Sequence, residues 1–133
     1  MKADYIVFGH FYGECVGEAC VETYKLTDSQ LFEDTSDVYP FGDKSYPGRF
    51  ELLNDSLFHA VKSLGDHIPT ELLASPDTVF GMPDGGDWGG IYFERSEKGI
   101  VRFWLIDKMR SNNPDYLNPF VDKIEAAIDR LSQ

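Results

Sequence analysis

The chain has 133 residues, enough for one hydrophobic core and too few for two domains, so we expect a single domain over residues 1–133. Its 42% hydrophobic content, with 10 Phe, 7 Tyr and 2 Trp, excludes the composition of a disordered chain. The net charge of -11, from 23 acidic and 12 basic residues, argues against nucleic acid and anionic membranes as partners, because both are bound chiefly through Lys and Arg.

The same negative charge suits a basic protein partner, or it serves solubility alone. The first five residues reach an acid before any apolar run, which is not the pattern of an export signal. The sequence also contains no run of about eighteen apolar residues, so it predicts no transmembrane helix. We therefore expect a cytoplasmic protein without a membrane partner.

Three strands are predicted near the N-terminus. Residues 4–12 are rich in β-branched and aromatic side chains on both faces, which favours a central strand. The turn that begins at Gly13 leads to a second strand over residues 21–26. Polar residues 27–30 then turn the chain into a third strand over residues 31–33.

A helix is predicted after an irregular segment. Residues 35–48 contain two prolines and two glycines among polar residues, which is typical of a surface excursion. Apolar residues then recur every three or four positions from Phe50 to Ile68, which predicts the first helix. Residues 70–74, between two prolines, form at most one further helical turn.

A β-hairpin and a second helix are predicted in the second half. Residues 91–95 and 100–106 alternate in strand fashion around a turn that ends in Gly99, and residues 78–80 are a candidate for one more short strand. Asn118 is expected to cap the last helix, with Pro119 at its first position. The order βββ-α-ββ-α indicates an α+β fold, with a mostly antiparallel sheet of five or six strands and two amphipathic helices on one face.

Cys15 and Cys20 flank four residues at the tip of the first predicted hairpin. Two cysteines across such a loop can reach disulfide distance, whereas in a cytosol they would stay thiols. Their spacing does not match the Cys-x-x-Cys redox motif, although one pair of zinc ligands can be spaced in this way. A structural role, a metal site and redox chemistry all remain open.

The loop over residues 81–90 holds five glycines and two carboxylates, Asp84 and Asp87, beside Trp88. Glycines permit the backbone of a tight loop to approach a ligand, and carboxylates are ligands for Ca²⁺ or Mg²⁺. The spacing matches no EF-hand, and the carboxylates would repel a phosphate. A structural turn, a ligand or partner site and a metal site are the alternatives.

The histidines point to no clear catalytic site. His10 lies in the first strand, where it could act with Cys15 as base and nucleophile if the hairpin brings them together, although a structural role is the simpler reading. His59 and His67 belong to the first predicted helix. The sequence contains no hydrolase, zinc-protease or dinucleotide-binding motif, so no catalytic residue is predicted. The possible surface aromatics are Tyr39, Phe41, Tyr46 and Trp88.

Two segments carry a family resemblance. Residues 11–17 and 81–92, with the patterns FYGECxG and GxPDxxDxGG, resemble a group of small uncharacterised bacterial proteins. Relatives carry Cys at the positions of Met82 and Gly85, which implies a metal site or disulfide in those relatives. This chain lacks that second pair, and the resemblance implies no activity.

The leading hypothesis is a non-enzymatic binding module, for a basic protein or a small ligand, that includes inhibitor- or immunity-type proteins. Its contact region would be the loops over residues 13–20 and 81–90. The alternative is a small metal- or thiol-dependent protein, which requires those two loops to meet; no other cofactor is predicted, and the oligomeric state stays open. The binding residues expected are Tyr12, Glu14, Asp84, Asp87 and Trp88, and those of the alternative are His10, Cys15, Cys20, Asp84 and Asp87.

Overall fold

A seven-stranded sheet forms the centre of the protein. The computed structural model describes residues 3–132, with Glu18 described by its backbone alone. The strand order is β4-β3-β2-β1-β6-β7-β5, and every neighbouring pair is antiparallel except β5 and β7. The strands are β1 (Tyr5–Phe11), β2 (Val21–Leu26), β3 (Leu31–Asp34), β4 (Phe50–Leu52), β5 (Val79–Phe80), β6 (Gly90–Glu97) and β7 (Ile100–Asp107).

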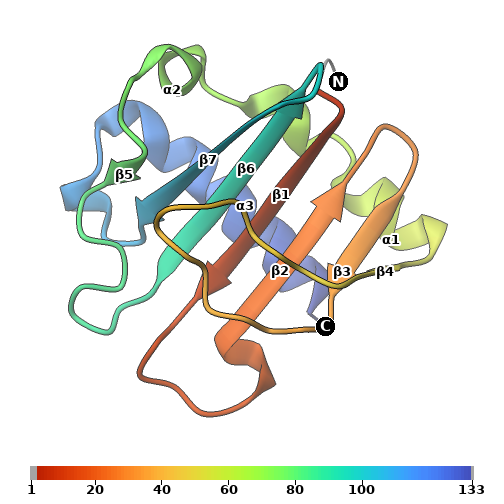
Figure 1. Cartoon of the computed structure of the whole chain (residues 1–133), viewed down its shortest axis with the longest axis horizontal. Coiled ribbons are helices and arrows are strands. Elements are labelled where there is room, and N and C mark those ends of the chain that lie inside the picture. The colour runs from red at the N-terminus through yellow and green to blue at the C-terminus, as the bar shows by residue number, and fades with distance from the viewer. Residues whose placement is uncertain (1–2, 133) are drawn as a thin grey trace.

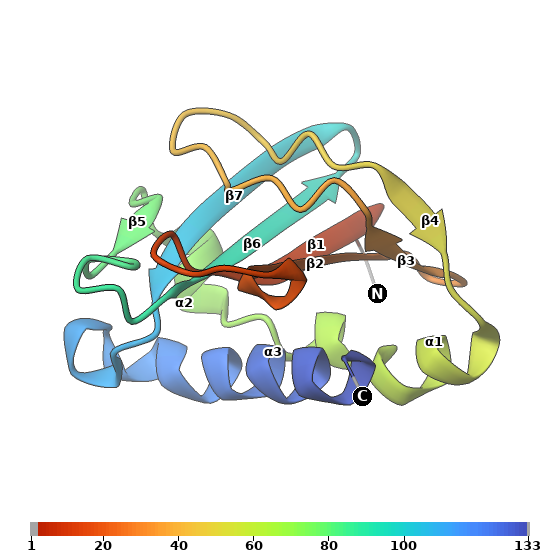
Figure 2. The same ribbon diagram turned by 90° about the horizontal axis from the view of Figure 1, so that it is seen from below.

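The helices lie together on one face of this sheet (Figures 1 and 2). The longest, α3, runs across β1 and packs against the segment that contains α1. No helix within the described residues has both the length and the apolar character needed to cross a membrane. The helices are α1 (Asp55–Val61), α2 (Thr70–Ala74) and α3 (Asn118–Leu131), with short 3-10 turns at Glu18–Cys20, Leu64–His67, Arg110–Asn112 and Asp115–Leu117.

The main core fills the space between the sheet and the helices. Alternation along β1 sends Ile6 and Phe8 to the helix face and Val7 to the opposite face, and all three are buried. On the helix face, Phe93 stacks on Trp104 and meets Phe120 of α3 edge-on. β1 occupies the centre of the sheet and is therefore buried on both faces.

Residues 35–49 cross the other face of the sheet as a strap, which Figure 2 shows on the side opposite the helices. Asp34, at the end of β3, holds both ends of the strap: its carboxylate accepts hydrogen bonds from the backbone N–H groups of Ser36 and Arg49 and from the Tyr46 hydroxyl. Burial alone would raise the pKa of Asp34, but these hydrogen bonds outweigh it and lower the pKa.

A buried carboxylate on β6 fastens the middle of the strap. Glu94 accepts hydrogen bonds from the Tyr5 and Tyr92 hydroxyls and from the backbone N–H of Tyr46. Burial and the hydrogen bond to Glu94 raise the pKa of Tyr92. The strap therefore closes a second, smaller core around Val7, Phe11, Val21, Tyr46 and Tyr92.

Much of the predicted fold is confirmed. The α+β class, the mostly antiparallel sheet, the central first strand and the hairpin around Gly99 are all present. In that hairpin Lys98 and Gly99 both have positive φ, as a two-residue turn between twisted strands requires. The candidate strand near Val79 is present as β5, at one edge of the sheet. The sheet has seven strands in place of the five or six expected, because residues 50–52 add an unpredicted strand at the other edge.

The helix predicted over residues 50–68 is wrong in its extent. Phe50, Glu51 and Leu52 pair with β3, so their backbone bonds go to a strand. Helix α1 begins only after Asn54, whose side chain accepts the Leu57 N–H, and a 3-10 turn replaces the helix over Leu64–His67. The repeat of apolar residues misled because it joins two separate packing environments: Phe50 packs against the smaller core under the strap, whereas Leu53 and Leu57 pack against the main core.

Two single-residue expectations are also corrected. Asn118 is the first residue of α3, and its side chain bonds to Arg110 and Asn113 in place of capping the helix. Tyr46 was expected at the surface, whereas it is buried beneath the strap; Tyr39 and Phe41 are exposed, and Trp88 is half-buried.

Replacing Asp34 by Asn should destabilise the protein by about 3 kcal/mol. Both carboxylate oxygens of Asp34 accept hydrogen bonds, whereas an asparagine side chain has only one oxygen that can accept them. Since the folded-state pKa of Asp34 lies below its ordinary value of 3.8, its stabilisation is present above that pH and is lost as the pH falls further. The free energy of unfolding, measured with urea between acidic and neutral pH, should therefore fall less steeply toward acidic pH in Asp34→Asn than in the wild type. The matched control is Asp43→Asn at an exposed position, which removes the same charge. It should leave the free energy of unfolding and its pH dependence unchanged.

Candidate functional site

The candidate site lies at one end of the sheet, where two loops emerge side by side (Figures 1 and 2). One loop joins β1 to β2 over residues 12–20, and the other leads into β6 over residues 81–89. Since β1 and β6 are paired, with Phe11 opposite Gly90, their loops leave the sheet together. The structure thus brings together the two loops that the sequence analysis singled out.

Asp84 ties the two loops to each other. Its carboxylate accepts a hydrogen bond from the backbone N–H of Gly13 at 2.8 Å and another from the Gly89 N–H at 3.0 Å. The Tyr39 hydroxyl of the strap donates a third at 2.9 Å. Burial and this bond to Asp84 raise the pKa of Tyr39 to about 12. Asp84 therefore works as a structural anchor for three segments.

The glycine pair at the start of β6 permits this junction. A Cβ atom on Gly89 would lie 2.3 Å from the Tyr12 ring, and one on Gly90 would lie 2.4 Å from the Phe11 ring. Gly89 also has a φ of 87°, which disfavours other residues. The aromatic pair Phe11-Tyr12 and the pair Gly89-Gly90 therefore pack directly against each other.

Asp107, at the end of β7, fixes the outer part of the 81–89 loop. Its carboxylate accepts the backbone N–H groups of Met82 and Met109 and the indole N–H of Trp88, at 2.7 to 2.8 Å. Burial opposes ionisation of Asp107, but these hydrogen bonds prevail and lower its pKa. Trp88, a predicted binding residue, is thus held half-buried by a charged acceptor.

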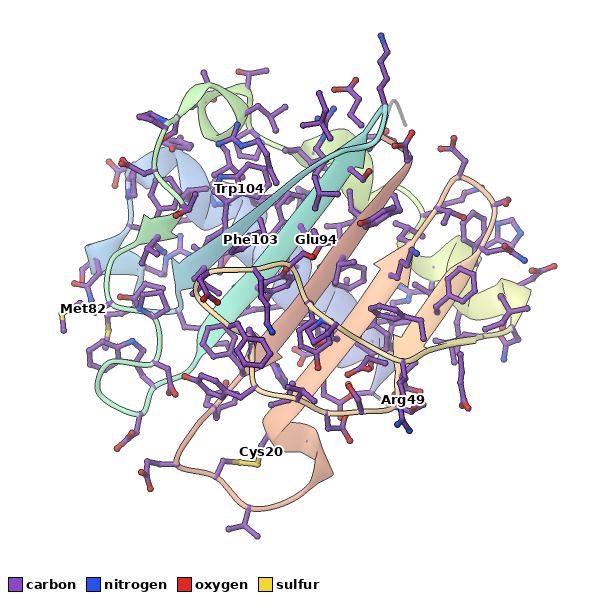
Figure 3. The ribbon with its side chains drawn as sticks, in the orientation of Figure 1. Cys20, Arg49, Met82, Glu94, Phe103 and Trp104 are labelled. Carbon is purple, nitrogen blue, oxygen red and sulfur yellow. A yellow bond between two sulfur atoms is a disulfide. The ribbon has the colours of Figure 1, made fainter. Side chains whose placement is uncertain are left out.

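A disulfide between Cys15 and Cys20 closes the tip of the first loop, as the yellow bond in Figure 3 shows. Neither sulfur is available as a metal ligand or nucleophile while this bond is intact. Disulfides persist in oxidising compartments, so the bond favours such a setting over the cytoplasmic one that the sequence predicts. His10 lies beside the loop, with its Nε2 3.0 Å from the Ala19 carbonyl oxygen.

His10 and Tyr12 face a lysine on the helix side of the sheet. Lys108 contacts the Tyr12 hydroxyl and ring and forms a 3.2 Å ion pair with Glu125 of α3. Burial is the main cause that lowers the pKa of His10, and the charge on Lys108 adds to that effect. His10 is therefore neutral at neutral pH and contributes a dipole in place of a charge.

Several side chains at this end remain exposed. The acids Glu14 and Asp87 point to solvent, and Val16 at the disulfide tip is fully exposed. Met82 is 64% exposed, and Figure 3 shows it projecting away from the ribbon. We call these residues, together with Met109, the loop-end surface. Glu14, Val16, Met82, Asp87 and Met109 are its members.

The predicted site residues fall into two groups. The side chains of Glu14 and Asp87 are exposed and form no hydrogen bond or ion pair within residues 3–132, whereas Tyr12, Asp84 and Trp88 hold the loops together. Within residues 3–132 no three His, Cys, Asp or Glu side chains are grouped to hold a metal ion. The arrangement places exposed acidic and apolar side chains on two loops that hydrogen bonds tie to each other and to the sheet.

The sequence analysis did not single out Asp107 or Lys108, and it named Tyr39 only as a possible surface aromatic. Asp107 is the last residue of the eight-residue strand β7 and the only acid in it, and an acid at such a strand end is a usable signal for a buried loop anchor. Lys108 and Tyr39 carry no such signal, because their partners lie far away in the sequence.

No protein-family model and no curated protein matches the chain. The resemblance of residues 11–17 and 81–92 to a bacterial family therefore stays a prediction. The packing of these two segments against each other gives a physical reason for both motifs.

Replacing Gly90 by Ala should destabilise the protein by about 2 kcal/mol, because the new Cβ would clash with the buried Phe11 ring. Gly42→Ala is the matched control, since its Cβ would meet only Leu105 at 3.9 Å. Chemical denaturation of both variants measures the difference. Equal stability of the two variants would contradict the close approach of the loops.

Reduction of the disulfide should lower the free energy of unfolding by about 2 kcal/mol, the loop-closure effect expected for so short a loop. Thiol titration of the denatured protein should detect no free thiol before reduction and both cysteines after it. A Cys15→Ala, Cys20→Ala double variant should have the same free energy of unfolding as the reduced protein. Adding reductant should not change the stability of this variant. Free thiols in the untreated protein would refute the bond.

Proposed function

We propose that the protein is a non-enzymatic binding module that uses the loop-end surface to contact a basic protein partner. The observation that carries the proposal is the anchoring of both loops by Asp84 and Asp107, which fixes exposed apolar and acidic side chains in place. A preorganised surface loses little conformational entropy on binding. An inhibitor or immunity protein for a basic enzyme is the concrete form of this function.

The composition of the loop-end surface supports protein binding. Methionine is enriched at protein interfaces. The side chains of Met82 and Met109 are both exposed, although their backbone N–H groups donate to the buried carboxylate of Asp107. Val16 presents an apolar side chain at the tip of a loop that the disulfide constrains. Exposed apolar side chains on rigid loops are what a partner surface can bury.

The charge of the surface supports a basic partner. Glu14 and Asp87 are exposed acids at its rim, and the whole chain carries -11. A negative field of this kind steers a positively charged protein toward the surface and selects against acidic ones.

The metal- or thiol-dependent alternative has no comparable support. The disulfide occupies both sulfurs, the Asp84 carboxylate already accepts three hydrogen bonds, and His10 faces a backbone carbonyl.

A Glu14→Lys, Asp87→Asn double variant should lose binding to the partner, because it removes both rim acids. Asn is chosen at position 87 because it tolerates the positive φ of that residue. The partner is first isolated from a lysate of the host on immobilised wild-type protein and identified. Its purified form is then titrated against each variant, with an expected loss of about tenfold or more in affinity. Raising the salt from about 0.1 M to about 1 M should weaken wild-type binding, because the screening length falls from about 10 Å to about 3 Å.

The matched control is Glu51→Lys, Asp66→Asn, which makes the same charge change at exposed positions in β4 and near α1. This control should bind like the wild type. Equal binding by both double variants would refute the proposed surface, and thermal melts would verify that each variant is folded.

A further inference from the structure

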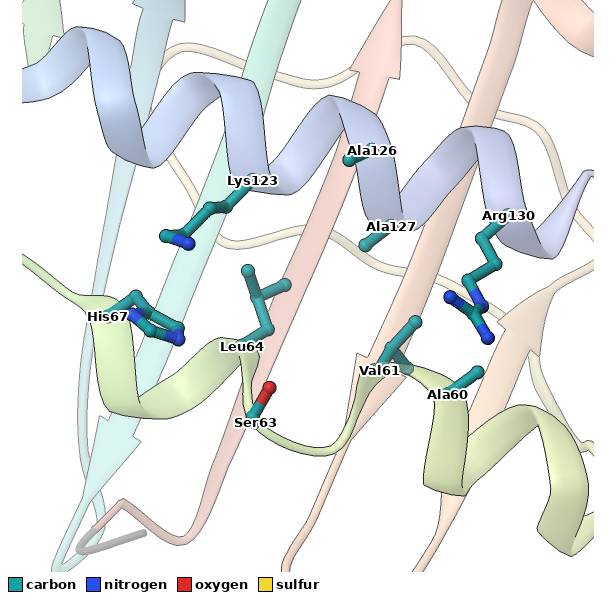
Figure 4. A pocket seen from close by; sticks show the side chains of 9 residues that line it. All are labelled: Ala60, Val61, Ser63, Leu64, His67, Lys123, Ala126, Ala127 and Arg130. Carbon is teal, nitrogen blue, oxygen red and sulfur yellow. The ribbon is translucent and has the colours of Figure 1, made fainter.

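A groove on the helix side of the protein is lined by basic side chains, whereas the loop-end surface carries acidic ones. It runs between α3 and the segment that contains α1 and the 3-10 turn Leu64–His67, and its volume is about 220 Å³ (Figure 4). Nine residues line this helix groove. They are Ala60, Val61, Ser63, Leu64, His67, Lys123, Ala126, Ala127 and Arg130.

The floor of the helix groove is apolar and fixed. Val61, Leu64 and Ala127 are buried members of the main core. Alanines at positions 126 and 127 leave space that larger side chains on α3 would fill. The hollow therefore results from small residues placed over a rigid floor.

The ends of the helix groove are cationic, although the chain as a whole is strongly acidic. Figure 4 shows His67 and Lys123 at one end and Arg130 at the other, with Leu64, Val61 and Ala127 between them. None of the nine lining residues is an acid. The exposed acids Asp66 and Asp129 lie nearby in sequence without lining the groove.

The two cations on α3 have no carboxylate partner within the described residues. On a helix, side chains three and four positions apart are neighbours, and for Lys123 and Arg130 the intervening neighbours are Ala126 and Ala127. Of the three acids of α3, Asp122 pairs with Arg110 and Glu125 pairs with Lys108. The third, Asp129, is adjacent to Arg130 in sequence but forms no ion pair with either cation within the described residues. Both charges are therefore available to a ligand.

We propose that the helix groove binds an elongated organic anion with an apolar body and a carboxylate at each end. One carboxylate would meet Lys123 and His67, the other would meet Arg130, and the body would cover Leu64 and Val61. Lys123 and Arg130 are seven residues apart, which is two helical turns and roughly 10 Å along the axis. A single carboxylate cannot bridge that span.

The size of the helix groove favours a small molecule as its occupant. At about 220 Å³ it is smaller than the ~300 Å³ at which drug-sized pockets begin. Guanidinium and ammonium groups both bind carboxylates through charge-assisted hydrogen bonds. A straight-chain dicarboxylate satisfies the charge, the length and the apolar floor together.

Titration of the isotope-labelled full chain with sebacate, at constant ionic strength and followed by amide NMR shifts, tests this proposal. Saturable shifts are expected in α1, in residues 64–67 and in α3. Decanoate, with one carboxylate, should bind at least about fivefold more weakly, and uncharged decanediol should not bind. The same loss of about fivefold is expected for Lys123→Glu and for Arg130→Glu.

Two further variants keep the test specific. Ala126→Leu fills the groove without changing its charge, and this exposed helical position tolerates Leu, so sebacate binding should be lost while the melting temperature is maintained. Lys98→Glu makes the same charge reversal at the β6–β7 turn and should bind like the wild type. The proposal is overturned if sebacate gives no saturable shifts, if decanoate binds equally well, or if both α3 reversals leave the affinity unchanged.

Discussion

Three carboxylates that collect hydrogen bonds from separate loops determine how this protein is arranged around its sheet. Asp34 holds the strap, Asp84 joins the strap to both loops of the site, and Asp107 fixes the outer part of the second loop. A carboxylate accepts several N–H and O–H groups at once, and such charge-assisted bonds are about twice as strong as neutral ones. Irregular segments that would otherwise move are thereby attached to strand ends.

These anchors connect the fold to the proposed function. β1 and β6 pair over their whole length, so the loops at their ends start from fixed positions. Asp84 then removes the remaining freedom of Gly13 relative to Gly89, and the disulfide restrains the tip beyond it. The exposed Glu14, Val16 and Met82 therefore belong to loops that hydrogen bonds and a disulfide restrain. Rigidity of this kind is what permits a small surface to bind selectively.

The sequence predicts those parts that depend on local pattern and misses those that depend on distant partners. Strand alternation and the Gly99 turn identify β1, β2, β6 and β7 because each pattern lies within a few residues. An acid in a glycine-rich loop looks the same whether it holds an ion or tethers another segment. Only the fold shows that Asp84 meets Gly13 across 71 positions. For the same reason, the apolar repeat from Phe50 could not reveal that β3 had a free edge for β4.

The distribution of charge distinguishes the loop-end surface from the helix groove. Acids inside the fold are satisfied by hydrogen bonds, and acids such as Glu14 and Asp87 remain exposed beside apolar side chains at the loop end. Cations without partners collect instead at the helix groove, where alanines separate Lys123 from Arg130. In a chain of net charge -11, a region lined by three basic side chains and no acid attracts anions that the rest of the surface repels. The two surfaces lie on different elements, β-strand loops and helices, so charge changes at one leave the contacts of the other in place.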